Sequence, residues 1–291
     1  MDVRFLESFV EVSDCGSVAE AARRLNLTPA AVMLRLKTIE RELGHPLVAR
    51  AGRTSRLTAS GLAVLPKARA LIIEARNLRA LAADKEPAGE LRLGSIATGL
   101  TGILPPAIAQ LSKRHPGIDF FIKPGSSSDL YDRVSRGEID AALIVQPPFP
   151  LPKSISWQTL REEPLVLLVP RAMKVTTVGD ALATARFIRY DRNQWGGQIV
   201  DRYLRKNKLK VREWLELDAL DSIAVFVSRG LGVAIVPDWV GFWPEGLRLK
   251  KIPLADCEMR RLGLLWNPAS PRISAIRALI DSCVGLPKSG S

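Results

Sequence analysis

Apolar positions near the start of the chain recur every three or four residues, which is the period of an amphipathic helix. Alanines between the apolar positions leave room for helices to pass close to one another. The first stripe consists of Phe5, Leu6, Phe9 and Val10, and a later one, expected to face inward, of Val32, Leu36, Ile39 and Leu43. This pattern predicts a small helical domain over 1–58.

Capping residues indicate where these helices begin and end. Ser17 with Glu20 three positions later has the form of a capping box, and it predicts a helix that runs to about Leu25. Thr28, followed by Pro29, predicts the start of the next helix. Two helices joined by so short a turn are typical of the helix-turn-helix, which places its second helix in the major groove of DNA. The alternative is a helical hairpin used for protein contacts.

A hairpin and a long helix are expected next. The run HPLVARAGRTSRLT predicts two short strands around Gly52, the wing of a winged helix-turn-helix. Thr58 then caps a helix over 59–83, and the segment 59–88 ends in the helix-breaking run DKEPAG. Apolar residues along this helix follow a heptad, which predicts a dimer linker; the main positions are Val64, Leu71 and Leu78. An amphipathic helix lying on its own domain is the alternative.

From Glu90 onward, short apolar runs alternate with helical segments, which predicts an α/β fold with mostly parallel sheets. Helices are expected over 101–114, 126–136, 178–185, 198–209, 220–229 and 272–284. The two series predict a two-lobed domain over 89–291, with the chain crossing near Leu160 and returning near Asn267. One lobe would then hold 89–160 and 267–291, and the other 161–266. A clamshell of this kind binds small ligands in its cleft.

Charge strengthens the assignment of the first domain to DNA. The 291-residue chain has a net charge of +12 and a pI near 10.0, and half of that excess lies between Ala21 and Gly61. A basic helix-turn-helix favours phosphate and base contacts. The residues expected to contact DNA are Thr28, Pro29, Ala30, Met33, Leu34, Arg35, Lys37, Arg50, Arg53 and Arg56.

Two hydroxyl-rich loops follow strands in the first lobe, where helix N-termini supply backbone donors that suit a carboxylate. The candidate effector-binding residues are Ser95, Thr98, Thr101, Ser126, Ser127 and Gln146, with Asn193 and Trp195 from the second lobe. The hydroxyls could equally be helix caps, and Trp195 either a stacking surface or a structural residue. Asp218 and Asp221 flank another helix start as caps or ligand contacts, and an amine-bearing effector would raise their importance.

Catalysis, cofactors and metals are not expected. His45 and His115 are the only histidines, and no HExxH, GxSxG or P-loop motif occurs. The opening residues carry acids and lack a long apolar run, so neither a secretion signal nor a membrane span is predicted. Three scattered cysteines fit a reducing cytoplasm. Cys257 and Cys283 are either a redox-sensing pair or two ordinary thiols.

The chain resembles the LysR-type transcriptional regulators over nearly its whole length. The resemblance rests on SVAEAARRLNLTPAAV, LKTIERELGHPLVAR and RLTASG, and later on RHPGIDFFIKPGSSSDL, RGEIDAALI and GLGVAIVP. Members of that family commonly have a polar residue at the position of Met33 and often Arg at that of Leu34, whereas both are apolar here.

The resemblance implies a cytoplasmic regulator that binds DNA as a dimer or a dimer of dimers. It implies a linker helix that dimerises and a sensing region similar to periplasmic binding proteins. Thr98 and Ser126 fall on positions that commonly contact an effector's acid group. The expected partners are double-stranded DNA, a small-molecule effector and further copies of the chain, with RNA polymerase as a candidate. The alternative is a ligand-binding protein with a non-specific or architectural DNA-binding module.

Overall fold

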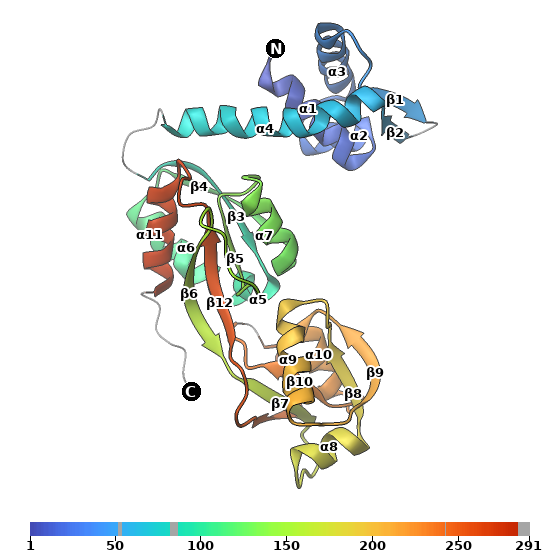
Figure 1. Ribbon diagram of the computed structural model, residues 1–291, viewed down its shortest axis with the longest axis vertical. Coiled ribbons are helices and arrows are strands. Elements are labelled where there is room, and N and C mark those ends of the chain that lie inside the picture. The colour runs from blue at the N-terminus through green and yellow to red at the C-terminus, as the bar shows by residue number, and fades with distance from the viewer. Residues whose placement is uncertain (52–53, 82–86, 242, 285–291) are drawn as a thin grey trace. The chain divides into compact units, whose positions relative to one another are not determined.

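Two compact units make up the chain, Met1–Ala83 and Asp84–Ser291, and each is described by itself. The computed structural model describes residues 1–51, 54–81, 87–241 and 243–284, without the side chains of 50–51 and 79–81. The first unit contains α1 (Val3–Cys15), α2 (Val18–Arg24), α3 (Pro29–Leu43), β1 (Val48–Ala51), β2 (Thr54–Leu57) and α4 (Ala59–Leu81) (Figure 1).

The first unit is a winged helix-turn-helix. Its core is built from the predicted stripes and consists of Leu6, Phe9, Val12, Ala21, Ala22, Val32, Leu36, Ile39, Leu47 and Ala68. Leu43 was expected to face inward but is exposed, because it belongs to the last turn of α3, just before the cap Gly44. Asn26, in the turn between α2 and α3, has φ of +53°, a left-handed conformation that asparagine tolerates.

The wing pairs β1 with β2 in antiparallel register, with Val48 opposite Leu57. Gly61 lies where a Cβ would come within 2.1 Å of the Leu47 carbonyl oxygen. Only glycine therefore allows the first turn of α4 to approach the strand this closely.

The heptad seam of α4 is divided between two environments. Ala68 is buried in the core of its own unit and Val64 packs against that core, so the first part of the helix lies on its own domain. Leu71 and Leu78 are 46% and 69% exposed. The helix continues through Pro66.

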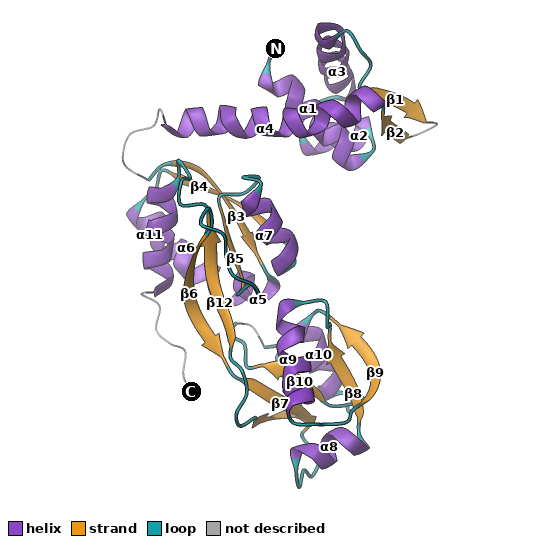
Figure 2. Ribbon diagram, viewed as in Figure 1, coloured by secondary structure: helices purple, strands orange, loops and turns teal. Residues whose placement is uncertain are grey.

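The second unit has two lobes. Lobe I contains β3 (Gly89–Ser95), α5 (Ala97–Gly102), α6 (Leu104–Arg114), β4 (Ile118–Pro124), α7 (Ser127–Ser135), β5 (Ala141–Val145), β6 (Ser156–Glu163), β12 (Arg260–Trp266) and α11 (Ile273–Val284). Its sheet has the order β4-β3-β5-β12-β6. The first three strands are parallel, and β12 runs antiparallel to β5 and β6. Helices lie on both faces of this sheet. Helix α11 packs on α6 on one face, and α7 covers the other face (Figure 2).

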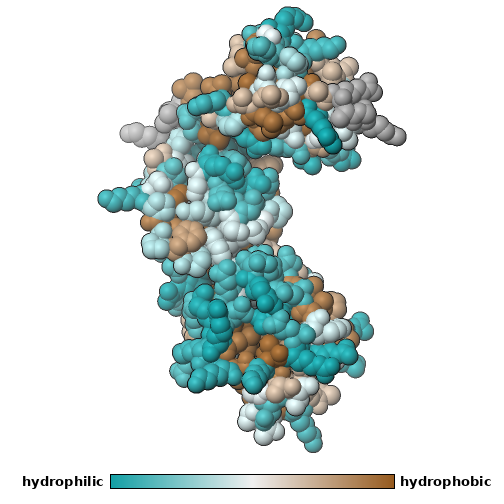
Figure 3. Space-filling model, turned by 45° about the vertical axis from the view of Figure 1, so that its right-hand side comes forward, coloured by the Kyte–Doolittle hydropathy of each residue, from teal (hydrophilic) through white to brown (hydrophobic). Residues whose placement is uncertain are grey.

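Lobe II contains β7 (Leu165–Pro170), α8 (Val178–Thr184), β8 (Arg186–Tyr190), α9 (Trp195–Lys206), β9 (Arg212–Leu217), α10 (Leu220–Ser228), β10 (Ala234–Pro237) and β11 (Leu249–Pro253). Strand β7 lies between β10 and β11 and is antiparallel to both, while β8 and β9 are parallel. A bridge from Phe187 to Val233 joins the two sheets. Polar side chains cover much of the visible face of each unit, where apolar residues form only patches (Figure 3).

The structure corrects several predicted elements. The helix expected over 101–114 is two helices, α5 and α6, and α9 begins at Trp195 rather than at residue 198. Strands β6 and β11 were not predicted. Because β12 pairs with β5 and β6 in the sheet of lobe I, the chain returns between Pro253 and Arg260, not near Asn267. The sheets of lobe II are also less parallel than expected, because β7 pairs antiparallel with both β10 and β11. No helix within the described ranges is long and apolar enough to cross a membrane.

Candidate functional site

The outer face of α3 carries most of the residues expected to contact DNA. Thr28 caps the helix by accepting a hydrogen bond from the Ala31 N–H at 3.2 Å. The exposed side chains on and around this helix are Pro29, Ala30, Met33, Leu34 and Lys37. This face is available to a partner, and its middle is apolar.

The four arginines expected at this interface differ in position. Arg35 is half-buried, and its guanidinium donates to Ser8 Oγ at 3.3 Å and to the Arg4 carbonyl oxygen at 3.5 Å. It therefore binds α3 to α1. Arg56 is exposed on β2. The side chain of Arg50 and the whole of Arg53 lie outside the described part of the chain.

A cavity of about 130 Å³ lies between the two lobes of the second unit. It brings together Thr98, Ser126 and Ser127, all of which the sequence indicated. Among the lining residues that the sequence did not indicate as ligand contacts are Tyr190, Gln194, Gly196 and Arg260. Asp218, for which the sequence left a cap or a ligand contact open, also lines the cavity.

A buried ion pair forms one wall of this cavity. The side chains of Arg260 and Glu163 are 1% and 0% exposed, and Arg260 Nε donates to Glu163 Oε2 at 2.7 Å. The same guanidinium donates to Thr98 Oγ1 at 3.3 Å. Glu163 also accepts the backbone N–H of Val240 at 3.1 Å. A buried charge needs this degree of pairing, because removing it from water is otherwise very costly.

Arg260 and Glu163 stand where β12 and β6 pass between the lobes. The pair therefore connects Thr98 in lobe I with Val240 in lobe II through the two crossover strands. A ligand that contacts Thr98 or Arg260 would act directly on the connection between the lobes.

Four helices begin at the cavity. Ser126 caps α7 by accepting a hydrogen bond from the Asp129 N–H at 3.2 Å. Ser126 is therefore both a helix cap and a residue that lines the cavity. The cap residues of α5, α9 and α10 are Ile96, Gln194 and Ala219, and none of them makes a side-chain cap hydrogen bond. The first N–H groups of a helix have no partner within the helix. The longer helices α9 and α10 therefore present positive dipole ends and first-turn N–H groups to the cavity, although the Ser222 N–H of α10 is already accepted by Asp221 at 2.8 Å.

Tyr190 packs tightly against the start of α9. A Cβ on Gly196 would come within 2.7 Å of the Tyr190 ring, so only glycine fits there. Burial raises the pKa of the Tyr190 phenol, an effect that Arg260 opposes and Asp218 reinforces. The phenol therefore stays protonated and can donate a hydrogen bond.

Five predicted effector residues do not line this cavity: Ser95, Thr101, Asn193, Gln146 and Trp195. Ser95 is fully buried and its hydroxyl donates to the Ile96 carbonyl oxygen at 3.0 Å. Thr101 is exposed, and its hydroxyl donates to the Ala97 carbonyl oxygen at 3.4 Å. Asn193 is exposed in the loop before α9.

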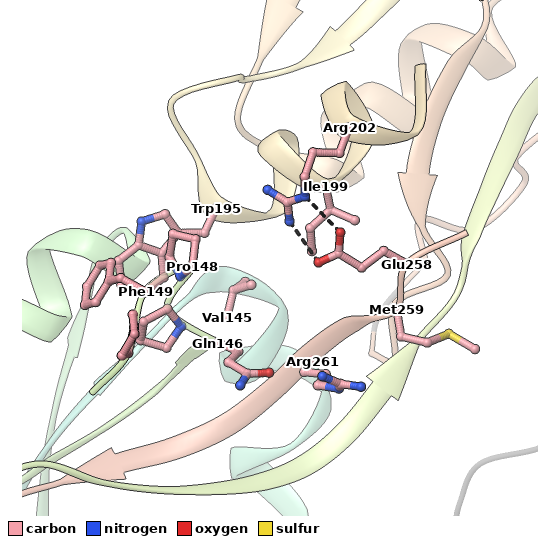
Figure 4. A pocket seen from close by; sticks show the side chains of 12 residues that line it. Val145, Gln146, Pro148, Phe149, Trp195, Ile199, Arg202, Glu258, Met259 and Arg261 are labelled. Carbon is pink, nitrogen blue, oxygen red and sulfur yellow. Dashed lines mark hydrogen bonds and ion pairs between the residues drawn. The ribbon is translucent and has the colours of Figure 1, made fainter. Parts of the chain in front are cut away.

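Gln146 and Trp195 line a separate, larger hollow of about 550 Å³ (Figure 4). Arg202 and Glu258 form a two-bonded ion pair on its wall, with both N–O distances at 2.8 Å. Trp195 is 8% exposed, and its ring meets those of Tyr131 and Phe149 edge to face. It is thus an aromatic contact between α9 and lobe I rather than an open stacking surface.

Comparison with known proteins gives matches along most of the chain. Residues 3–62 match the family model for the bacterial regulatory helix-turn-helix protein of the lysR family, and residues 84–286 match the LysR substrate binding domain. The regulator IlvR of Caulobacter vibrioides is 28% identical over 294 residues, covering 96% of this chain and 97% of its own. CzcR of Bacillus cereus is 27% identical over 238 residues, covering 81% and 80%.

Solved structures agree on the fold. Full-length CbnR in complex with its target DNA has a TM-score of 0.67 at 20% identity, covering 97% of this chain and 99% of its own. The probable transcriptional regulator PA0477 of Pseudomonas aeruginosa has a TM-score of 0.73 at 18% identity, covering 99% and 98%. The resemblance noted in the sequence is confirmed by these matches.

Proposed function

Because the chain belongs to the LysR family of DNA-binding transcriptional regulators, we propose that a small carboxylate bound between its two lobes controls its affinity for specific DNA sites. The DNA is contacted by α3 and the wing. The protein acts in the cytoplasm as a dimer or a dimer of dimers, with RNA polymerase as a candidate partner. Other members of the family are regulators, which favours the absence of catalysis.

The buried Arg260 is the observation that carries the carboxylate assignment. Its guanidinium lines the cavity and already holds the hydroxyl of Thr98. Around it stand the hydroxyls of Ser126 and Tyr190 and the N-termini of α9 and α10. Guanidinium, hydroxyl and backbone N–H donors that converge on one cavity suit an anion, and a carboxylate accepts from several N–H and O–H groups at once.

Control of DNA binding follows from linkage. A ligand shifts a conformational equilibrium only as far as it prefers one state. A carboxylate bound to Thr98 and Arg260 contacts the Arg260–Glu163 ion pair, which joins the two crossover strands. The affinity for the carboxylate therefore depends on the relative orientation of the two lobes. If a change in the orientation of the lobes alters the spacing of two DNA-binding modules, the affinities for ligand and for DNA are coupled reciprocally.

Dimerisation through the second half of α4 supplies the two modules. Leu71 and Leu78 lie seven residues apart and are exposed, as a heptad seam with a partner helix requires. One winged module reads only a half-site, so a two-fold site needs two.

DNA selected from a random duplex pool tests the first half of the proposal. The protein should prefer the selected site over a scrambled duplex, measured by fluorescence anisotropy. Arg56→Ala should weaken binding to both duplexes. It should also reduce the steepness with which the logarithm of the binding constant falls with the logarithm of salt concentration, by about one. Equal affinity for the selected and scrambled duplexes would instead support an architectural module.

A thermal-shift screen of small monocarboxylates tests the second half, with one pair of variants on the same helix. Thr98→Val removes a hydroxyl inside the cavity, whereas Thr101→Val removes one outside it. Stabilisation should be lost in Thr98→Val and kept in Thr101→Val. A carboxylate whose affinity is unchanged by Thr98→Val and Ser126→Ala would place the effector elsewhere.

A further inference from the structure

The charges at the interlobe cavity do not sum to a simple anion site. Arg260 is the cation among its lining residues, but Glu163 is bonded to the same guanidinium and neutralises it. Asp218, at the junction between β9 and α10, also lines the cavity and adds a carboxylate. The site therefore holds convergent hydrogen-bond donors together with a net negative charge, an arrangement that repels a second ligand carboxylate and attracts a cation.

The acidic groups near Asp218 are engaged, whereas Asp218 is not. Glu216 accepts from the Arg192 guanidinium at 3.1 Å, and Glu213 from the same group at 2.5 Å. Asp221 accepts the Ser222 N–H at 2.8 Å. In the described ranges no hydrogen bond or ion pair engages the carboxylate of Asp218.

The cavity is also small. Its volume of about 130 Å³ is well below the roughly 300–1,000 Å³ of sites for drug-sized ligands. A ligand that fills it and also reaches Asp218 must carry its two polar groups only a few atoms apart.

Building on the proposed function, we propose that the effector is a small amino carboxylate, an α-amino acid with a short uncharged side chain. Its carboxylate accepts from Thr98, Ser126 and the adjacent helix N-termini, and its ammonium group donates to Asp218. An ammonium has donors only. Backbone N–H groups cannot accept from it, and a carboxylate is the acceptor that forms its strongest, charge-assisted hydrogen bond. The unpaired Asp218 is the acceptor that completes the site.

Isothermal titration of the full-length protein with paired probes tests this inference. The amino acids glycine, L-alanine, L-serine and L-valine are each compared with the carboxylate that lacks the amine: acetate, propionate, 3-hydroxypropionate and 3-methylbutanoate. At least one amino acid should bind roughly tenfold or more tightly than its partner, the effect of one charge-assisted hydrogen bond.

Asp218→Asn and Asp221→Asn form a matched pair, because both aspartates are exposed and they stand three residues apart. Asp218→Asn should remove the preference for the amino acid and leave the amine-free carboxylate bound as before or more tightly. Asp221→Asn should change neither. Because Asp218 is exposed, its replacement should not unfold the protein.

The outcomes separate this inference from the proposal beneath it. Carboxylates that bind as tightly as their amino acids, with no effect of Asp218→Asn, would overturn the amino carboxylate and leave the carboxylate effector standing. A preference for the amino acid that survives Asp218→Asn would overturn the role of Asp218. Failure of both series to bind would overturn the inference and the small-carboxylate effector together.

Discussion

Helices begin differently in the DNA-binding unit and at the interlobe cavity. In the first unit, α1, α2 and α3 each start with a side-chain cap: Asp2 accepts from Arg4 at 2.9 Å, Ser17 from Glu20 at 3.4 Å and Thr28 from Ala31 at 3.2 Å. At the cavity, α5, α9 and α10 start after residues that make no such bond. In the first region a cap residue satisfies each of these helix N-termini, whereas of the four helices that begin at the cavity only α7 has such a cap, Ser126.

The difference has an energetic meaning. A side-chain cap contributes about 1 kcal/mol to stability. An uncapped N-terminus forgoes that contribution but keeps N–H groups and a positive dipole end for an anion. The first unit must present a rigid helix to DNA, whereas the second must hold a molecule that comes and goes.

Breaking the buried pair should have the largest effect on the second unit. Arg260→Met leaves Glu163 buried and unpaired, which should lower the free energy of unfolding by about 3–5 kcal/mol. The neighbouring Arg261 pairs with Glu162 at 2.8 Å, but both side chains are 51% exposed. Arg261→Met should therefore cost about 1 kcal/mol or less.

Urea unfolding followed by tryptophan fluorescence measures this difference. All six tryptophans lie in the second unit, so the signal reports that unit alone. Equal losses in the two variants would show that the Arg260–Glu163 pair is not desolvated as described.

Removing a cap from the DNA-binding unit should have a moderate effect. Thr28→Ala removes the acceptor for the Ala31 N–H, and it should lower the stability of the first unit by about 1 kcal/mol. Far-UV circular dichroism reports the helices of both units, so the loss should show as an earlier helical transition that tryptophan fluorescence does not share. The tryptophan transition of the second unit should not move, and a shift in it would contradict the independence of the two units.

Adding a cap at the cavity should have a smaller effect of opposite sign. Ala219→Ser supplies a hydroxyl at the start of α10, where the cap residue makes no side-chain hydrogen bond and Asp221 accepts the Ser222 N–H. We expect about 0.5 kcal/mol of added stability, measured by the tryptophan transition. Ligand affinity should fall, because the new hydroxyl competes for the N–H groups. A variant with higher stability and undiminished ligand affinity would separate capping from binding.

The smallest expected difference between the two units is in the reactivity of their cysteine thiols. Burial raises the pKa of Cys283 to about 12, and burial together with Glu11 raises that of Cys15 to about 11. A raised thiol pKa keeps the group protonated at pH 8, so little of the reactive thiolate is present. Alkylation by iodoacetamide should be slow for both in the folded protein and slower for Cys283. Rapid labelling of Cys283 would reopen its role as a redox sensor.

Caps also explain how much of the fold could be predicted from the sequence. The starts of α2 and α3 were placed at the right residue because Ser17 and Thr28 are local signals. The starts of α5 and α9 were placed too late, at 101 and 198, because Ile96 and Gln194 give no such signal. The start of α10 was nevertheless placed at the right residue, 220, although Ala219 makes no cap hydrogen bond, so a missing cap makes a helix start harder to locate but does not hide it.

The candidate site shows the same limit. Thr98, Ser126 and Ser127 stand at or next to the start of a helix that follows a strand, a position that sequence reasoning can find. Arg260 was missed because its partner Glu163 is 97 residues away, and nothing in the run RRLGLLW tells which arginine points inward. Strand β6 was missed because its sequence SWQTLREE is polar, and its position depends on pairing with β12.

Amide chemical shifts test the central contrast most directly. Proton–nitrogen correlation spectra of the full-length protein would be recorded while the best-binding carboxylate or amino acid from the paired probes is added. We predict shifts at the backbone N–H groups of Thr98 and Gly196, in the uncapped helices α5 and α9, and none at Glu20 and Ala31, in the capped helices. Saturable binding without a change at Thr98 and Gly196 would contradict the account.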